Sequence, residues 1–361
     1  MKYIDEFRSS SAAQALAQKI TETLDGRKVT LMEICGGHTL SIFKYGLLDL
    51  LPDSVQLIHG PGCPVCVTTN AYIDAAVALA AHKKNIICTF GDLMKVPGST
   101  RSLHDAKAAG GDIRTVYSPL DALALAADNP AHIVVFLAVG FETTIPASAV
   151  TVKTAYERQC GNFFILSAHK MTPPAMQVIV NDPEIALDGF ICPGHVTTII
   201  GAEPYRFLAD EFALPCSIAG FEPLDVLHSI LQLCRMYVEK KTDIAINYSR
   251  AVRPEGNIAA QKVIAEVFKP ADTLWRGFGT IPMSGYVLAD TYADFDAVRM
   301  LDYTPEPLLE HAGCICGDVL RGKVKPTACP LFGNTCTPEA PVGACMVSSE
   351  GACATYYHYG R

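Results

Sequence analysis

Residues 29–39 read VTLMEICGGHT, a short β-branched and apolar run that passes directly into a glycine-rich turn. The same rhythm recurs along much of the chain: an apolar run, a turn with Gly, Pro, Cys or His, and then a longer stretch rich in Ala and Leu. Strands and helices that alternate in this way are typical of a parallel sheet. The sequence therefore predicts an α/β fold.

The pattern also places the individual elements. The predicted strands are Val29–Ile34, Val55–His59, Ile86–Phe90, Ile113–Tyr117, Ile133–Val139, Phe163–Ser167, Gly189–Cys192 and Cys216–Ala219. The predicted helices are Ser11–Leu24, Asn70–His82, Leu120–Ala127, Leu224–Lys240 and Asn257–Phe268. Most of the unusual residues directly follow a predicted strand, where the carboxyl ends of parallel strands form a ligand crevice. We therefore expect these loops to form one shared site or two facing sites.

At 361 residues, the chain is long enough for more than one domain. A short internal echo, in which residues 33–39 resemble residues 191–197, favours two similar halves. We expect a first α/β domain over residues 1–140 and a second over residues 141–290, facing each other across a cleft. A small cysteine-rich module should follow over residues 291–361.

Composition restricts the class of protein. A net charge of −8 and the lack of a Lys/Arg stripe argue against nucleic acid as a partner. The longest apolar run, Ile133–Val139, is far shorter than the roughly 20 residues that span a bilayer. The first residues are acidic and carry no apolar signal core, so we expect a cytoplasmic protein. In that compartment thiols stay reduced, and fourteen cysteines indicate metal ligation or thiol redox chemistry rather than a disulfide scaffold.

Cysteines are concentrated near the end of the chain. Six of the fourteen lie there: Cys314, Cys316, Cys329, Cys336, Cys345 and Cys353. After about Pro305 the sequence is dense in Cys, Gly and Pro, and small units of this kind are commonly held together by metal. The spacing matches neither a zinc ribbon nor a ferredoxin run, which favours an iron–sulfur cluster on irregular loops. The alternative is a tail held by zinc with no redox role.

A Cys-x-x-Cys pair, Cys63 and Cys66, lies in the sequence GPGCPVC over residues 60–66. It runs into the helix predicted to begin near Asn70, and a helix N-terminus favours the thiolate. The pair can form a reversible disulfide or supply two iron ligands. The other interpretation, half of a zinc site, calls for a second such pair, which the sequence lacks.

A second cysteine motif, CGGHT, follows the first predicted strand. Its glycines let the backbone approach a ligand closely, while Cys35 and His38 offer one soft and one borderline metal donor. A nucleophilic Cys/His pair or a buried core thiol are the alternatives. Weaker candidates for proton transfer, each also explicable as a helix cap or loop contact, are Asp92, Glu142, His169, His195 and Glu222. The cysteines in apolar surroundings are interpreted as core thiols: Cys88, Cys160, Cys192, Cys216 and Cys234.

Taken in order, seven motifs resemble the HypD family of hydrogenase maturation factors: MEICGGHT (32–39), HGPGCPVC (59–66), TFGD (89–92), GFETT (140–144), AGFEP (219–223), CPLFG (329–333) and MVSSEGAC (346–353). The resemblance spans essentially the whole chain. It implies a scaffold on which iron acquires cyanide and carbon monoxide ligands before transfer to the large subunit of a nickel–iron hydrogenase. It also implies two partners, a HypC-type small chaperone and a HypE-type cyanide donor.

The same resemblance implies roles for individual residues. Cys35 matches the cysteine that holds iron jointly with the chaperone, and His38 is its motif companion. Cys63 and Cys66 match the redox-active or iron-contacting pair. For a 4Fe-4S cluster the resemblance implies the ligands Cys316, Cys329, Cys336 and Cys353, with Cys345 as the first substitute.

One position departs from the family pattern. The family often carries a second histidine at the place of Leu40, so a second imidazole is not required here. A rival hypothesis from another class is a stand-alone iron–sulfur-dependent thiol–disulfide oxidoreductase. That hypothesis accounts for Cys63 and Cys66 but leaves Cys35 and His38 without a role.

Overall fold

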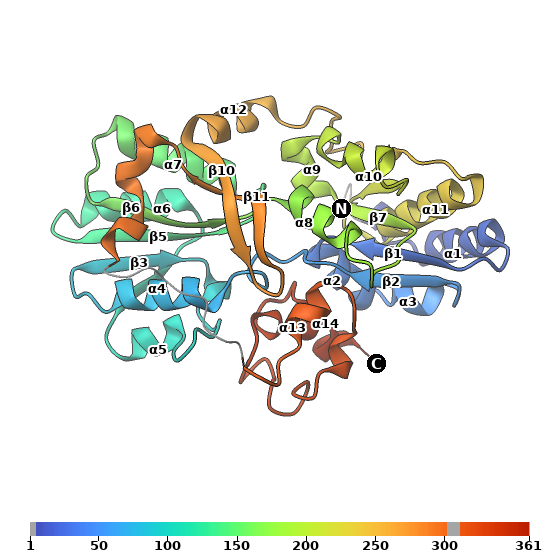
Figure 1. Cartoon of the computed structure of the whole chain (residues 1–361), viewed down its shortest axis with the longest axis horizontal. Coiled ribbons are helices and arrows are strands. Elements are labelled where there is room, and N and C mark those ends of the chain that lie inside the picture. The colour runs from blue at the N-terminus through green and yellow to red at the C-terminus, as the bar shows by residue number, and fades with distance from the viewer. Residues whose placement is uncertain (1–4, 302–310, 361) are drawn as a thin grey trace.

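The computed structural model, in which residues 5–301 and 311–360 are described, contains two parallel β-sheets flanked by helices. The two sheets lie side by side along the long axis of the molecule, and the cysteine-rich C-terminal region lies beneath their junction (Figure 1). The predicted α/β class is therefore confirmed. Within the described residues, every helix is too short or too polar to cross a bilayer.

The first sheet has the strand order β2-β1-β7-β8-β9, and all neighbouring pairs are parallel. Its strands are β1 (Val29–Glu33), β2 (Val55–His59), β7 (Gly189–Pro193), β8 (Cys216–Ala219) and β9 (Ile244–Ile246). Its helices are α1 (Ser10–Leu24), α2 (Gly36–Lys44), α3 (Leu47–Leu50), α9 (Gly194–Ile200), α10 (Arg206–Asp210) and α11 (Pro223–Glu239). Helix α11 buries Leu227, Ile230 and Leu231 at helical spacing, and these side chains form one core with Ile20 and Leu24 of α1.

The second sheet has the order β4-β3-β5-β6 and is also parallel throughout. Its strands are β3 (Asn85–Thr89), β4 (Asp112–Thr115), β5 (Ile133–Gly140) and β6 (Phe163–His169). Its helices are α4 (Asn70–Ala80), α5 (Leu103–Ala108), α6 (Pro119–Asp128) and α7 (Ile145–Glu157). Strand β5 is buried along nearly its whole length, as a parallel strand covered by helices on both faces should be.

The two sheets share one topology. In each, the first strand along the chain lies between the second and the third, so the winding reverses between β1 and β7 and again between β3 and β5. Parallel sheets bind ligands outside the carboxyl ends of their strands at such reversal points. We therefore expect a ligand site in the loops after these four strands.

The sheets do not divide the chain at residue 140, where the sequence placed a boundary. Strands β3 to β6 form one sheet, while β1 and β2 join β7, β8 and β9 to form the other. The internal echo between residues 33–39 and 191–197 thus belongs to β1 and β7, which are neighbours in a single sheet. Each is a strand that ends in a glycine-led helix, and this shared local geometry accounts for the similarity.

A β-hairpin absent from the predictions lies over the junction of the two sheets (Figure 1). It consists of β10 (Phe268–Trp275) and β11 (Gly279–Leu288), and α8 (Thr172–Val180) and α12 (Ile258–Val267) pack near it. At its tip, Arg276 donates its backbone N–H to the carbonyl of Val67 at 2.9 Å. A Cβ on Gly277 would lie 2.6 Å from the Cα of Gly317, so the tip presses against the cysteine-rich region.

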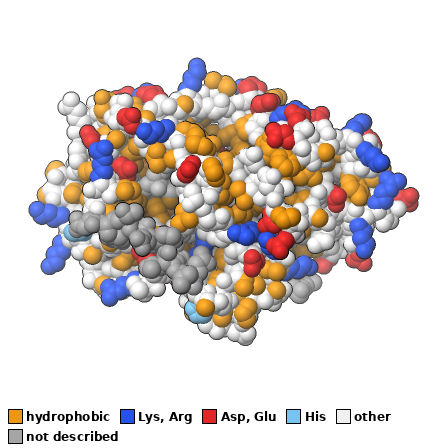
Figure 2. All heavy atoms as spheres, viewed as in Figure 1, with side chains coloured by type: hydrophobic (Ala, Val, Ile, Leu, Met, Phe, Trp, Pro, Cys, Tyr) orange, Lys and Arg blue, Asp and Glu red, His pale blue; other side chains and the backbone are white. Residues whose placement is uncertain are grey.

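Over residues 311–360 the C-terminal region holds two short α-helices, α13 (Cys316–Leu320) and α14 (Ala352–Tyr359). The short 3-10 helices of the described residues are η1 (Asp5–Phe7), η2 (Gly91–Leu93), η3 (Glu203–Tyr205), η4 (Asp290–Phe295), η5 (Ala297–Met300), η6 (Pro326–Ala328) and η7 (Ala344–Met346). On the face shown in Figure 2, Lys and Arg side chains are scattered among acidic ones rather than gathered in a stripe.

Candidate functional site

A pocket of about 350 Å³ lies where loops of both sheets meet. Its lining comes from the loop after β2, the loops after β3 and β5, the start of α9 and the segment before α14: Gly62, Pro64, Val65, Phe90, Asp92, Leu93, Val139, Gly140, Phe141, Thr143, Thr144, His195 and Glu350. The loops after β3, β5 and β7 belong to the reversal points of the two sheets. The pocket therefore occupies the position at which parallel sheets bind ligands.

Cys35 lies beside this pocket, at the N-terminal end of α2. Its side chain is buried, and its sulfur lies 3.7 Å from Nδ1 of His195. Burial raises the pKa of the Cys35 thiol well above its ordinary value, and the nearby carboxylates of Glu350 and Glu33 raise it further. A metal cation that replaces the proton would favour the thiolate over the thiol, because metal binding requires the thiolate.

Glycines allow the loops around Cys35 to touch. A Cβ on Gly62 would lie 2.3 Å from both the Cα and the amide nitrogen of Cys35, and the carbonyl of Gly62 accepts the N–H of Gly36 at 3.1 Å. A Cβ on Gly36 would lie 2.2 Å from the carbonyl oxygen of Glu350. Only residues without side chains allow backbones to approach so closely. The Cys63 loop and the segment before α14 are thereby pressed against the Cys35 loop.

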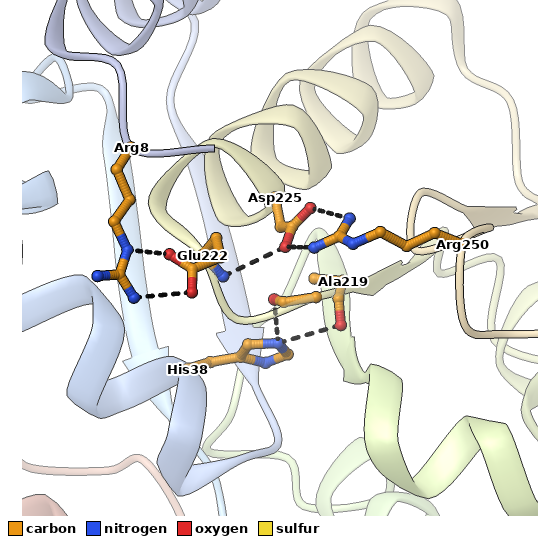
Figure 3. Close-up of polar contacts among 7 residues, drawn as sticks. Arg8, His38, Ala219, Glu222, Asp225 and Arg250 are labelled. Atoms are coloured by element: carbon orange, nitrogen blue, oxygen red, sulfur yellow. Dashed lines mark hydrogen bonds and ion pairs between the residues drawn. The ribbon is translucent and has the colours of Figure 1, made fainter. Parts of the chain in front are cut away.

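The ring of His38 points toward the loop after β8 (Figure 3). Its Nε2 lies 3.0 Å from the carbonyl oxygen of Gly220 and 3.4 Å from that of Ala219, so Nε2 carries the proton. Burial and the neighbouring His195 lower the pKa of His38 to about 4, which keeps the ring neutral. Its Nδ1 is buried and makes no hydrogen bond within the described residues. This nitrogen therefore presents a lone pair.

The loop that holds His38 is itself fixed by ion pairs (Figure 3). Arg8 reaches from the N-terminal segment to Glu222 at 2.5 Å, and Arg250 contacts Asp225 at 2.5 Å. The ring of Phe221, in the same loop, stacks on His38 at 4.9 Å and lies 5.1 Å from the ring of His195. The Glu222 side chain predicted as a weak candidate thus holds this loop rather than lining the pocket.

His195 was predicted from the sequence only as a weaker candidate for proton transfer, but it lies at the centre of the site. It lines the pocket, touches the sulfur of Cys35, and burial lowers its pKa to about 4. The available signal was the echo between residues 33–39 and 191–197, because β1 and β7 pair directly and bring the two loops together. The buried thiol of Cys35 and the half-buried imidazole of His195 form a pair that can bind a soft metal ion or pass a proton.

Cys63 and Cys66 connect the pocket to the cysteine-rich region. The backbone N–H of Cys66 donates to the sulfur of Cys63 at 3.3 Å, and the Cys66 thiol is in hydrogen-bonding contact with the thiols of Cys63 and Cys345. Burial raises the pKa of Cys66 well above its ordinary value. The predicted pair therefore joins the terminal cysteines in one continuous group of thiols.

All six terminal cysteines line a single cavity, together with Val319, Leu331, Phe332, Gly343 and Met346. Cys345 is central, because its thiol contacts those of Cys66, Cys316 and Cys353. The buried guanidinium of Arg276 lies at the same cavity, next to Gly343. Within residues 5–301 and 311–360, no three Cys, His, Asp or Glu side chains form a group that could hold one metal ion. The cysteines surround a space instead of converging on a point.

The weaker candidates are divided between the pocket and the interior. Asp92 lines the pocket. Glu142 is buried and accepts the backbone N–H of Thr172 at 2.7 Å, and His169 lies 3.2 Å from the hydroxyl of Ser148. Among the predicted core thiols, four are buried and Cys160 is only partly so.

Two buried imidazoles, of His38 and His169, and the half-buried one of His195 should make the fold sensitive to acid. Burial lowers the pKa of His169 to about 3 and those of His38 and His195 to about 4, from an ordinary value of 6.5. Below pH 6.5 the unfolded chain binds protons that the folded chain does not. Stability is therefore lost as the pH falls, at about 1.4 kcal/mol per pH unit for each imidazole. We expect urea titrations to show that the free energy of unfolding of His169→Gln decreases less between pH 6.5 and 4 than that of the parent protein.

Glu142 acts in the opposite direction, because burial raises its pKa to about 7 from an ordinary value of 4.5. Protonation of this carboxyl therefore stabilises the fold as the pH falls from 7 to 4.5. The comparison of the two proteins, rather than the absolute slope, is the test of the imidazole effect. Equal slopes in parent and variant would contradict it.

Comparisons with known proteins agree with these motifs. A family model described as "HypD: Hydrogenase formation hypA family" matches residues 11–360. The hydrogenase maturation factor HypD2 of Bradyrhizobium diazoefficiens is 49% identical over 370 residues, covering 100% of this chain and 97% of that protein. The hydrogenase maturation factor HypD of Escherichia coli is 44% identical over 366 residues, covering 99% of this chain and 98% of that protein. The chain therefore belongs to the HypD family of hydrogenase maturation factors.

Proposed function

We propose that the chain is a redox-active scaffold for assembly of the Fe(CN)2(CO) group of nickel–iron hydrogenase, working in the cytoplasm with a HypC-type small chaperone and a HypE-type cyanide donor. The observation that carries this proposal is the position of Cys35, a buried thiol 3.7 Å from His195 beside the pocket between the two sheets. A thiolate suits an iron that will carry strong-field ligands. Neutral His195 can accept the thiol proton as iron binds, and the remaining positions on the iron are left for cyanide, carbon monoxide and a chaperone thiolate.

The donor set of the cysteine cavity fits a 4Fe-4S cluster, since soft thiols on irregular loops surround one space. We assign the ligands to Cys316, Cys329, Cys336 and Cys353, with Cys345 as the first substitute. When bound, such a cluster supplies single electrons. The contact of Cys345 with Cys66 supports electron supply toward the Cys63–Cys66 pair.

The Cys63–Cys66 dithiol supplies the reducing equivalents for cyanide transfer. If the donor carries cyanide as a thiocyanate, one two-electron exchange balances. The two thiols become a disulfide, the sulfur–carbon bond of the thiocyanate breaks, and the products are a donor thiol and hydrogen cyanide. The proton of hydrogen cyanide leaves as cyanide binds iron. Cys63 and Cys66 contact each other, as this exchange requires.

Replacing Cys66 by alanine should separate the cluster from the chemistry at Cys35. After anaerobic purification with the coexpressed chaperone and donor, we expect Cys66→Ala to keep about four irons and four sulfides per chain. It should lose the cyanide stretches in the infrared spectrum, because a single thiol cannot complete the two-electron exchange. Cys234→Ala, which removes another buried thiol, from α11, is the matched control and should behave like the parent.

Each other outcome has a definite meaning. Parental cyanide bands in Cys66→Ala would refute the dithiol step while leaving the Cys35 scaffold intact. Turnover of disulfide substrates by the isolated chain, with no dependence on the chaperone, would favour the thiol–disulfide oxidoreductase. Zinc without sulfide in the parent protein would favour the alternative in which zinc holds the C-terminal region together and has no redox role.

A further inference from the structure

Glu33, the last residue of β1, is a fully buried carboxylate that fixes the Cys35 loop. Its Oε2 accepts the backbone N–H of Cys35 at 2.9 Å. Its Oε1 accepts hydrogen bonds from the hydroxyl of Thr39 and from Nδ1 of His59, the latter at 2.6 Å. A buried carboxylate is stable only when such donors surround it. The orientation of the Cys35 backbone therefore depends on the groups that hold Glu33.

His59, the last residue of β2, connects Glu33 to helix α14. It pairs with Glu33 across the β1–β2 ladder, and its Nε2 lies 3.2 Å from the hydroxyl of Tyr356 on α14. The Tyr356 ring packs on Phe43 at a centroid distance of 4.4 Å and on His59 at 5.3 Å. Burial and the charge of Glu33 raise the pKa of Tyr356 to about 12, so its hydroxyl keeps its proton. Tyr356, His59 and Glu33 thus form a chain of hydrogen bonds that ends at the amide of Cys35; we call it the Tyr356 chain.

The Tyr356 chain begins on the helix, α14, that also carries one cysteine of the cysteine cavity. Cys353 lines that cavity and lies three residues before Tyr356 on α14, a spacing that places both on one side of the helix. The segment just before α14 makes a second contact with the same loop, where the carbonyl of Glu350 meets Gly36. A group that holds Cys353 in place therefore also holds Tyr356 against His59.

We propose that the Tyr356 chain couples occupancy of the cysteine cavity to the geometry of the Cys35 loop, with Tyr356, His59 and Glu33 acting as positioning residues. The inference rests on the proposed function in one respect, the cluster assigned to the cavity. Its consequence is an order of events: the Cys35 loop takes its iron-binding geometry only in molecules whose cavity is filled. Iron delivered early would then meet an unprepared site.

Amide hydrogen exchange at Cys35 tests the coupling directly, because this N–H is the last donor of the chain. In anaerobically purified full-length protein with its cluster, Tyr356→Phe should raise the exchange rate of the Cys35 amide about fivefold to tenfold, the worth of one hydrogen bond. The phenyl ring preserves the packing on Phe43. Tyr357→Phe, at a partly exposed neighbouring position of α14, is the matched control and should leave exchange unchanged.

Two further comparisons distinguish coupling between the cysteine cavity and the Cys35 loop from a general loss of order in that loop. His59→Asn keeps a donor near Nδ1 for Glu33 but loses the reach to Tyr356, so the double variant with Tyr356→Phe should exchange no faster than either single variant. Removal of the cluster from the parent by chelation should raise exchange at Cys35 to the level of Tyr356→Phe. It should cause no further rise in that variant.

The outcomes are distinct from those that test the proposed function. Unchanged exchange in Tyr356→Phe, additive effects in the double variant, or equal protection with and without the cluster would each overturn the coupling. Loss of cyanide bands in the parent protein with the exchange pattern intact would refute the scaffold function and leave the coupling standing. If Tyr356→Phe unfolds in a urea titration at a lower midpoint than Tyr357→Phe, the double variant still decides, since coupled residues give non-additive effects.

Discussion

Cys35→Ala should retain the full iron and sulfide content of the cysteine cavity and lose every cyanide and carbonyl band from the infrared spectrum. The side chain supplies a sulfur beside His195, and alanine leaves no soft donor in its place. Anaerobic purification with the coexpressed chaperone, followed by iron and sulfide analysis and infrared spectroscopy, provides the measurement. We expect the loss to be complete, because no weaker ligand replaces a thiolate at this position.

The control for this variant is Cys88→Ala. Cys88 is a buried thiol in β3 of the second sheet, and burial raises its pKa to about 12, so it is a protonated core side chain. Its replacement removes a sulfur of similar burial and should leave the infrared bands in place. Persistence of the bands in Cys35→Ala, or their loss in Cys88→Ala, would contradict the assignment of Cys35 as the iron ligand.

Gly62→Ala is expected to have an effect nearly as large without removing any chemical group. The new Cβ would lie 2.3 Å from the Cα and the amide nitrogen of Cys35, and backbone atoms cannot yield as a flexible side chain can. The loop after β2 must then move away from α2, which separates Cys63 from Cys35. We expect a loss of about 1–3 kcal/mol in the free energy of unfolding, typical of overpacking, together with loss of the infrared bands.

Gly161→Ala is the matched control for the glycine variant. A Cβ at Gly161 meets no heavy atom within 4 Å, so the same chemical change there carries no steric cost. Urea unfolding and infrared spectra of both variants make the comparison. A Gly62→Ala protein that matched the parent in both measurements would show that the tight contact between the two loops is not required.

Local pattern was sufficient for most of the fold. The strand limits Val55–His59 and Cys216–Ala219 were predicted as observed, and the helix predicted over Ser11–Leu24 begins one residue earlier. These segments have strong periodicity and clear turn residues at their ends. The β10–β11 hairpin was missed, because β10 continues directly from α12 without a turn residue and carries exposed polar positions.

Long-range pairing accounts for what the sequence could not provide. The strands are not divided between the two sheets at residue 140 because β7 pairs with β1, and nothing local in either strand specifies that partner. The same pairing creates the contact between Cys35 and His195, which are 160 positions apart. Motif chemistry was sufficient to predict Cys35, Cys63 and Cys66 as site residues. Their order in space, from the pocket to Cys66 and on to Cys345, required the structure.

The interleaved topology also has a consequence for biosynthesis. The second sheet is formed by consecutive strands, so it can fold as soon as β6 has left the ribosome. The first sheet must wait with β1 and β2 unpaired on one side until β7, β8 and β9 are made, and non-local closure of this kind is slow. Cys66 meets Cys345 only when almost the whole chain has been translated. A nascent chain therefore carries exposed thiols long before it can bury them, and protection by chaperones would be needed most in that interval.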